Sequence, residues 1–195
     1  MPDNPSSTIQ LLTQRVSHAS LGFPGPSQDE LDTIIRAGMR APDHAMQRPW
    51  HFVIVEGERR DALGVVLNES LKIRGVTDEA QLKKALNAPL RAPVVIAVML
   101  KFKDHPKVER NEQIGSAAAA TYAMSLAANA LGFGSMWRTG LYATDPHVIS
   151  ALGGGDKDEV IGFLYIGTRE GPSKLTPALD PEDYITHFSR ALGSV

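Results

Sequence analysis

The sequence predicts a single domain that combines helices and strands, in either the α/β or the α+β class. Three observations support this prediction. The chain has 195 residues, which is enough for one domain with a substantial core. Segments with helical periodicity alternate with short apolar runs that are typical of strands. No part of the chain resembles a linker, an internal repeat or a low-complexity block, so we expect one domain over residues 1–195.

The first part of the chain predicts two helices separated by a turn. Residues 6–16 have apolar side chains at helical spacing, and the segment 21–26, rich in Gly and Pro, predicts a turn or loop. A second helix begins at Ser27, because Ser27 and Glu30 have the spacing of a capping box, in which each side chain satisfies a free backbone N–H. We expect this helix to end at Pro42, since the residue before a proline is disfavoured in the helical region.

The middle of the chain predicts two strands and two helices. Residues 51–56 (HFVIVE) predict a strand, and polar helices are expected over about 58–70 and over 78–87. The continuous apolar run 94–100 (VVIAVML) predicts a strand that is covered on both faces, because a strand with one wet face would alternate apolar and polar residues. The charged segment 104–112 is expected to be exposed.

The last part predicts the longest helix and the remaining strands. Residues 113–131 are rich in Ala and predict a long helix, followed by a short extended segment over 135–138. Asp145-Pro146 combines a capping residue with a first-turn proline, so a short helix is expected over 145–152. The run 160–168 (VIGFLYIGT) predicts another strand, and the proline-containing tail from Gly171 is expected to lie over a surface.

Composition excludes several classes of protein. There is no Cys, which rules out disulfides, thiolate catalysis, Fe–S clusters and cysteine-ligated zinc. The formal net charge of -2 gives no overall positive field for nucleic acid. The N-terminus lacks the features of a signal peptide, and the longest apolar stretch, 117–131, is too short and too polar to span a bilayer. We therefore expect a cytoplasmic protein that binds neither nucleic acid nor a membrane.

Common nucleotide-binding and hydrolase motifs do not occur in the sequence. Gly132-Phe133-Gly134 begins like the dinucleotide fingerprint GxGxxG, but Trp137 stands in place of the third glycine and a helix precedes the segment. There is no phosphate loop, no GxSxG and no HExxH. His44 and His51 lie close in the sequence but lack a third ligand, so no metal site is predicted.

Three short segments concentrate residues that could bind a charged or aromatic cofactor: Arg15-Val16-Ser17, residues 36–52 and residues 132–140. The second segment links a helix to a strand through a loop of Asp, His, Gln, Arg and Pro, and such loops often carry binding groups. Structural roles are the alternatives. Arg15 also fits a cationic last turn of the first helix, and Trp137 also fits a core position.

The sequence resembles the nitroreductase family, and in particular its small members. Four runs carry the resemblance, in the expected order and spacing: RAGMRAPDH (36–44), PWHFVIVEG (49–57), LGFGSMWRTG (131–140) and VIGFLYIGT (160–168). The similarity extends over about residues 9 to 170. It implies an α+β fold with a central mixed sheet wrapped by helices and a long central helix. It also implies a homodimer with two FMN sites at the subunit interface.

The resemblance implies a set of FMN contacts in the first segment. The family has an Arg-[Arg/Lys]-Ser turn that here is Arg15-Val16-Ser17. Arg15 would pair with the phosphate or with the pyrimidine edge of the flavin, and Ser17 would donate to the phosphate. Val16 replaces the usual second basic residue, and Ser20 stands where many relatives have another Arg. With these departures, we expect one cationic phosphate contact to be absent and FMN to bind more weakly.

The other two segments supply the remaining FMN contacts that the resemblance implies. Arg40 and His44 would reach the cofactor from the partner subunit. Trp137, Arg138 and Thr139 match the third FMN segment, with Arg138 as a phosphate ligand and Thr139 as a hydroxyl donor. Surface charges are the alternative for Arg40 and Arg138.

Related sequences also place the nicotinamide cofactor against the end of the long helix. In this chain the corresponding residues are Ala127, Ala128, Asn129, Ala130, Leu131 and Gly132. Small residues here would allow close approach of NADH or NADPH, and they equally suit helix packing at a dimer interface.

The resemblance implies an NAD(P)H-dependent flavoenzyme. A hydride from NADH or NADPH would reach FMN at N5, and a small electron-poor acceptor, such as a nitroaromatic or a quinone, would then be reduced. Such a cycle needs no side-chain nucleophile and no metal. Other interpretations remain open: a flavin reductase or enone-type reductase on the same fold, or a non-catalytic protein that stores FMN or senses redox state. An FMN-free structural protein is disfavoured, because the chain retains Arg15, Arg40, His44 and Arg138.

Overall fold

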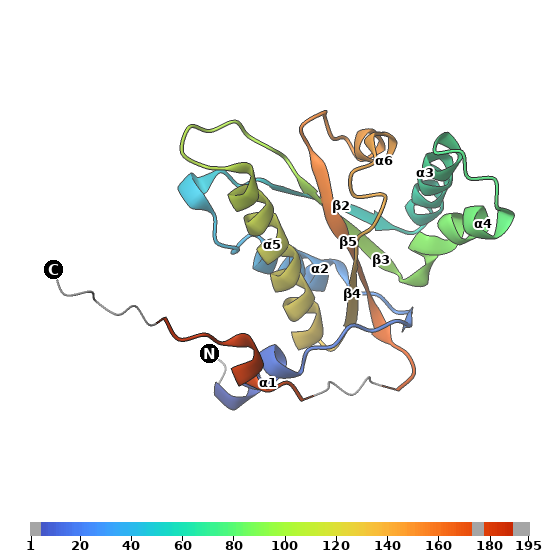
Figure 1. Cartoon of the computed structure of the whole chain (residues 1–195). Helices are drawn as coiled ribbons and strands as arrows, with labels where there is room; N and C mark the ends of the chain where they lie inside the picture. Colours follow the sequence, from blue (N-terminus) through green and yellow to red (C-terminus); the bar gives the residue numbers. More distant parts are fainter. Residues whose placement is uncertain (1–4, 173–177, 189–195) are drawn as a thin grey trace.

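The computed structural model describes residues 5–172 and 178–188 and shows an antiparallel sheet with helices on both of its faces (Figure 1). The longest strand, β5, pairs with β3, which in turn pairs with β2. β5 also pairs with β4 and, farther along its own length, with β1. All these pairings are antiparallel, so the mixed sheet that the resemblance implied is not found among the described residues. The strands are β1 (Leu21–Gly22), β2 (Trp50–Glu56), β3 (Val94–Leu100), β4 (Gly134–Arg138) and β5 (Glu159–Arg169).

Helices cover the sheet in two groups. The helices α2 and α5 lie on one face, and α3, α4 and α6 lie on the other (Figure 1). The helices are α1 (Pro5–Gln14), α2 (Gln28–Gly38), α3 (Arg59–Ile73), α4 (Glu79–Asn87), α5 (Arg110–Ala130) and α6 (Pro146–Ala151). Short 3-10 helices occupy His44–Met46, Ala88–Arg91 and Pro181–Tyr184.

The core has two parts, one on each side of β3. Val95, Ala97 and Met99 pack with α3, α4 and α6, whereas the alternate residues of the strand pack with α2 and α5. Successive side chains of a strand point to opposite faces, so a strand that serves two cores must be apolar throughout. The expectation that residues 94–100 form a strand covered on both faces is confirmed.

The capping box predicted at Ser27 is present. The Ser27 hydroxyl accepts the Glu30 N–H, and the Glu30 carboxylate accepts the Ser27 N–H at 2.8 Å. The predicted end of this helix is wrong, because α2 stops at Gly38, four residues before Pro42. The Met39 amide still bonds four residues back, but the Arg40 and Ala41 amides bond to carbonyls three residues back, which closes a tighter turn than an α-helix allows.

Other boundaries differ by a few residues. α1 ends at Gln14, so Arg15 follows the helix and does not lie in its last turn. α5 begins at Arg110, inside the segment expected to be exposed, because the Glu112 carboxylate accepts the Glu109 N–H at 3.0 Å and caps an earlier start. The expected turn over 21–26 contains the two residues of β1, which pair with the end of β5.

The C-terminal tail was expected to lie over a surface. Residues 173–177 and 189–195 lie outside the described residues. The described part, 178–188, is exposed throughout. It includes Tyr184 and Phe188, which are 73% and 91% exposed.

Candidate functional site

Four of the predicted site residues line one cavity of about 440 Å³, which we call the Ser17 pocket. Arg15 and Ser17 come from the segment after α1, and Trp137 and Thr139 come from the end of β4. Tyr122 and Ser125, on α5, complete the wall and were not predicted. No carboxylate is found among the described residues that line this cavity.

Hydrogen bonds between α5, β4 and the segment after α1 hold this pocket together. The His18 N–H donates to the Ser135 carbonyl at 3.0 Å, which ties the segment carrying Ser17 to β4. The Ser125 and Ser135 hydroxyls lie 2.8 Å apart, and the Asn129 side-chain amide donates to the Ser135 hydroxyl at 3.0 Å. Ser135, on β4, therefore fixes the positions of α5 and of the segment after α1.

Trp137 forms a wall of the Ser17 pocket. Trp137 is 37% exposed and lines the cavity, so it is not a core tryptophan. Its indole N–H donates to the Ile161 carbonyl at 3.3 Å. A Cβ at Gly162 would lie 2.0 Å from the indole nitrogen, so the ring can rest on the strand only because this residue is glycine.

A second cavity, the Arg138 pocket, lies on the other side of β4 and encloses about 360 Å³. Thr139 lines both cavities. Arg138 lies in the second pocket and not with Arg15, its guanidinium 5.5 Å from the centre of the Tyr165 ring. The other lining residues are Leu67, Lys84, Asn87, Ala88, Arg91, Tyr142 and Phe163.

The Arg138 pocket is positively charged. Lys84, Arg91 and Arg138 line it, and none of the described lining residues is acidic. Burial, and then the charge of Arg91, lower the pKa of Arg138. Like charges in a partly buried cavity favour an anionic occupant. Lys84 and Arg91 were not predicted, because they belong to no motif and reach β4 only through the packing of α4 and the 3-10 helix after it.

Arg40 and His44 line neither of these pockets and lie in an exposed region. His44 Nδ1 lies 2.7 Å from the Glu112 carboxylate, at the start of α5. Ser125, in the Ser17 pocket, is 13 residues farther along that helix, a rise of about 20 Å. Within one chain the two groups of residues therefore occupy separate regions.

The loop that carries His44 has an unusual backbone. Ala45, Met46 and Arg48 have φ values of 55°, 51° and 47°, in the left-handed region that non-glycine residues rarely adopt. The Arg48 N–H donates to the Asp43 carboxylate at 2.6 Å, which braces the loop. Such strain is common where a loop presents a binding group.

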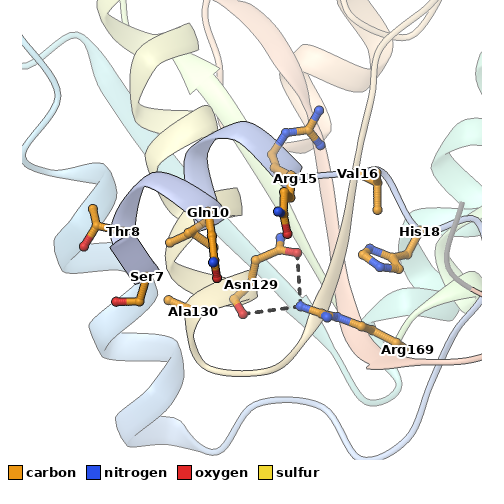
Figure 2. A pocket seen from close by; sticks show the side chains of 11 residues that line it. Ser7, Thr8, Gln10, Arg15, Val16, His18, Asn129, Ala130 and Arg169 are labelled. Atoms are coloured by element: carbon orange, nitrogen blue, oxygen red, sulfur yellow. Dashed lines mark hydrogen bonds between the residues drawn. The ribbon is translucent and has the colours of Figure 1, made fainter. Parts of the chain in front are cut away.

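A third cavity, the Arg169 pocket, lies beside the end of α5 and encloses about 570 Å³ (Figure 2). Arg15 lines it too, so it adjoins the Ser17 pocket. Its remaining residues come from α1, the segment after it, α5 and β5: Ser7, Thr8, Gln10, Leu11, Gln14, Val16, His18, Asn129, Ala130 and Arg169.

Two of the six residues expected to contact the nicotinamide cofactor line this third pocket, namely Asn129 and Ala130. Ala128 is fully buried against the core, and Ala127 packs beside it. Leu131 and Gly132 are exposed after the helix end, and Gly132 has φ 92°, as a helix-terminating glycine requires.

Neither a membrane-spanning helix nor a cluster of metal-binding side chains is found in the described part of the chain. None of its helices is long and apolar enough to cross a membrane. No group of three or more His, Asp or Glu side chains within it is placed to hold a metal ion.

The sequence is similar to those of proteins in the nitroreductase family. The model of the nitroreductase family matches residues 15–168. YdjA of Escherichia coli K12, an inferred NAD(P)H nitroreductase, is 42% identical over 181 residues, which cover 92% of this chain and 98% of YdjA. An inferred NAD(P)H nitroreductase of Haemophilus influenzae is 36% identical over 182 residues, with coverage of 92% and 98%.

Solved structures share the fold. A nitroreductase-like family protein from Bacillus cereus superposes with a TM-score of 0.82 at 21% identity, covering 96% of this chain and 99% of that protein. A nitroreductase with bound FMN from Bacteroides fragilis superposes with a TM-score of 0.70 at 22% identity, covering 93% of this chain and 98% of that protein.

Proposed function

The chain belongs to the nitroreductase family of oxidoreductases, and from that premise we propose that it binds FMN and uses NADH or NADPH to reduce a small electron-poor acceptor. The observation that carries this proposal is the convergence of Arg15, Ser17, Trp137 and Thr139 on one cavity. These residues come from two segments more than 110 positions apart in the sequence, and the similarity to the family had marked both segments.

The side chains fit FMN. Ser17 and Thr139 offer hydroxyl donors and Arg15 offers a guanidinium, which suits a phosphate or the polar edge of a flavin. Trp137 and Tyr122 offer aromatic surface for a ring system. The described lining residues include no carboxylate that would repel the phosphate. The Bacteroides fragilis relative is described with bound FMN, and the Escherichia coli relative is named for NAD(P)H.

FMN, when bound, supplies the redox chemistry by accepting a hydride at N5 and passing the electrons on. The protein binds the cofactor, orients it and tunes its redox chemistry. Lys84, Arg91 and Arg138 give a positive field next to the Ser17 pocket, which would stabilise negative charge on a bound cofactor. Of residues 127–132, Asn129 and Ala130 line the adjoining pocket, so the nicotinamide donor would approach the end of α5 at these two residues.

The proposed site takes Arg40 and His44 from a second copy of the chain. The separation of about 20 Å along α5 between His44 and Ser125 supports this, since each group of residues would then serve a different copy. Size-exclusion chromatography with light scattering tests the dimer, and a protein that is monomeric at all concentrations would contradict the shared site. We place the protein in the cytoplasm, where NADH and NADPH are available.

The visible absorption spectrum of the purified protein, with FMN added, tests the proposed reaction. Under anaerobic conditions the flavin bands should bleach on addition of NADPH or NADH, and a nitroaromatic or quinone should restore them. Bound flavin that does not bleach would favour FMN storage or redox sensing. Restoration by an enone or by free flavin, but by neither of the other two, would identify a different acceptor class on the same fold.

A further inference from the structure

The Arg169 pocket has an excess of positive charge that the proposed FMN site does not explain. Arg15 and Arg169 line it, and no carboxylate does so among the described residues. Neither arginine takes part in an ion pair within the part of the chain that the structure describes. Cations that converge on a cavity without a counter-charge favour an anionic ligand.

Arg169 is held in place from one side. Its Nε donates to the Phe133 carbonyl at 3.1 Å. Its Nη2 donates to the carbonyl and the side-chain oxygen of Asn129 at 3.3 and 3.2 Å, as Figure 2 shows. A guanidinium has five N–H donors in a rigid plane, so these bonds fix the plane and leave Nη1 for a ligand.

His18 supplies an independent sign of a missing partner. The residue is only 9% exposed, and its Nδ1 has no hydrogen-bond partner among the described residues. Buried polar atoms are normally satisfied, so an orphan beside a cavity points to a ligand. Burial and the charge of Arg169 lower the pKa of His18, and Arg15 adds to this, against an opposing effect of the Ser135 carbonyl. A lowered pKa favours the neutral ring, whose Nδ1 can donate or accept according to the tautomer.

Gly134 makes room for this arrangement. A Cβ at this position would lie 2.9 Å from Arg169 Cγ and 3.1 Å from His18 Cγ. Both side chains therefore pack against bare backbone, and their placement is built into the sheet where β4 meets β5.

We propose that the Arg169 pocket binds a phosphate group of the nicotinamide dinucleotide donor, with Arg169 as the main ligand and His18 as a neutral hydrogen-bonding partner. The inference rests on the proposed function, because the Arg169 pocket shares Arg15 with the Ser17 pocket. A donor whose nicotinamide lies at the flavin would extend its phosphates into this adjoining cavity. Gln10, Gln14 and Thr8, on α1, offer polar groups for the rest of the nucleotide.

Equilibrium binding of the oxidised dinucleotides tests the proposal without turnover. Calorimetric titration of NADP+ and NAD+ is carried out with and without added FMN on the wild type, Arg169→Ala, Arg169→Lys and His18→Ala. Arg59→Ala, an exposed arginine at the start of α3 and outside the three pockets, is the matched control.

We expect Arg169→Ala to raise the Kd of NADP+ about tenfold or more, as for the loss of a charge-assisted hydrogen bond. Arg169→Lys should recover part of the affinity, His18→Ala should show a smaller loss, and Arg59→Ala should bind as the wild type does. A loss for NADP+ alone assigns the 2′-phosphate, and an equal loss for NAD+ assigns the diphosphate. Both results support the proposal.

Unchanged Kd values for both dinucleotides in Arg169→Ala would overturn the proposal. A weaker affinity for FMN with unchanged dinucleotide binding would overturn it too, because the pocket would then hold the flavin phosphate. The proposal would also be overturned if the wild type bound neither dinucleotide. Failure of the proposed function would differ, since it would appear in the wild type as FMN that is not bound or not bleached.

Discussion

At the scale of single residues, the site depends on the alternation of side chains along β4 and its extension. Trp137 faces the Ser17 pocket, Arg138 faces the Arg138 pocket, and Thr139 lines both. Because successive side chains of an extended strand point to opposite faces, three adjacent residues can serve two cavities. The segment therefore combines an aromatic wall, a cation and a hydroxyl at one point.

Replacement of Arg15 should weaken FMN binding. Arg15 is the only cation among the described residues of the Ser17 pocket, so Arg15→Ala removes its charge-assisted contact. We expect a rise in the Kd of FMN of about tenfold to a hundredfold. Flavin fluorescence quenching measures it, with Arg59→Ala as the control. An FMN affinity equal to that of the wild type would exclude Arg15 from the site.

Gly162→Ala should displace Trp137. The added Cβ would lie 2.0 Å from the indole nitrogen, so the ring must move away from β5. We expect a shift of the tryptophan emission maximum and a weaker affinity for FMN. Gly155→Ala is the matched control, because its nearest neighbour to a Cβ is an Asp158 oxygen at 4.0 Å. If both variants kept the emission and affinity of the wild type, the packing of Trp137 on Gly162 would not position the wall.

At the scale of elements, the close packing of α3 on α4 supports the Arg138 pocket. A Cβ at Gly64 would lie 2.2 Å from the Leu86 carbonyl oxygen, which belongs to the backbone and cannot turn away. Gly64→Ala should therefore push the helices apart and cost about 1–3 kcal/mol of unfolding free energy. Urea denaturation measures this loss.

Gly115→Ala in α5 is the control for that experiment, because a Cβ there meets nothing within 4 Å. The control should be neutral or more stable than the wild type, since alanine favours helix. Equal stability of Gly64→Ala and the wild type would show that the α3–α4 contact tolerates a side chain.

The start of α6 should make stability depend on pH through Asp145. Burial alone would raise the pKa of this carboxyl, but hydrogen bonds from Ser70, Arg74 and the Val148 amide lower it overall. A pKa that is lower in the folded state means that the carboxylate stabilises the fold above the unfolded pKa, and that this contribution is lost as pH falls through the folded pKa. Asp145→Asn should therefore cost about 1–3 kcal/mol at neutral pH.

Urea denaturation at neutral pH and in acid measures both stabilities. The difference between Asp145→Asn and the wild type should shrink as the pH falls below about 4. A difference that stayed constant over this range would show that the charge of Asp145 does not contribute to folding.

At the scale of the whole molecule, the proposed site is divided between two copies of the chain. Arg15→Ala and Arg40→Ala should each lose FMN as homodimers. In a mixed dimer of the two variants, one site combines an intact Arg15 with an intact Arg40, and the other site lacks both. We expect differently tagged, co-expressed variants to yield a mixed dimer that retains about one FMN, measured by absorbance per dimer. Absence of flavin from the mixed dimer would contradict the division of the site.

Local features of the fold could be predicted because they depend on neighbours in the sequence. The capping box of Ser27 and Glu30 and the apolar strand 94–100 follow from spacing and periodicity, and both are confirmed. The end of α2 was predicted wrongly, since Pro42 marks where a helix cannot continue but not where it stops. The roles given to Arg15, Ser17, Trp137 and Thr139 came from the family motifs.

The sequence by itself determined the helices and most strands, the family, and the segments that contain the candidate cofactor residues. Only the tertiary structure decided which residues share a cavity. Lys84 and Arg91 join Arg138, and His18 joins Arg169, only because helix packing and the pairing of β4 with β5 bring distant segments together. These contacts leave no periodic or spaced pattern in the chain, because each depends on sheet register and side-chain direction, which are set by the core as a whole.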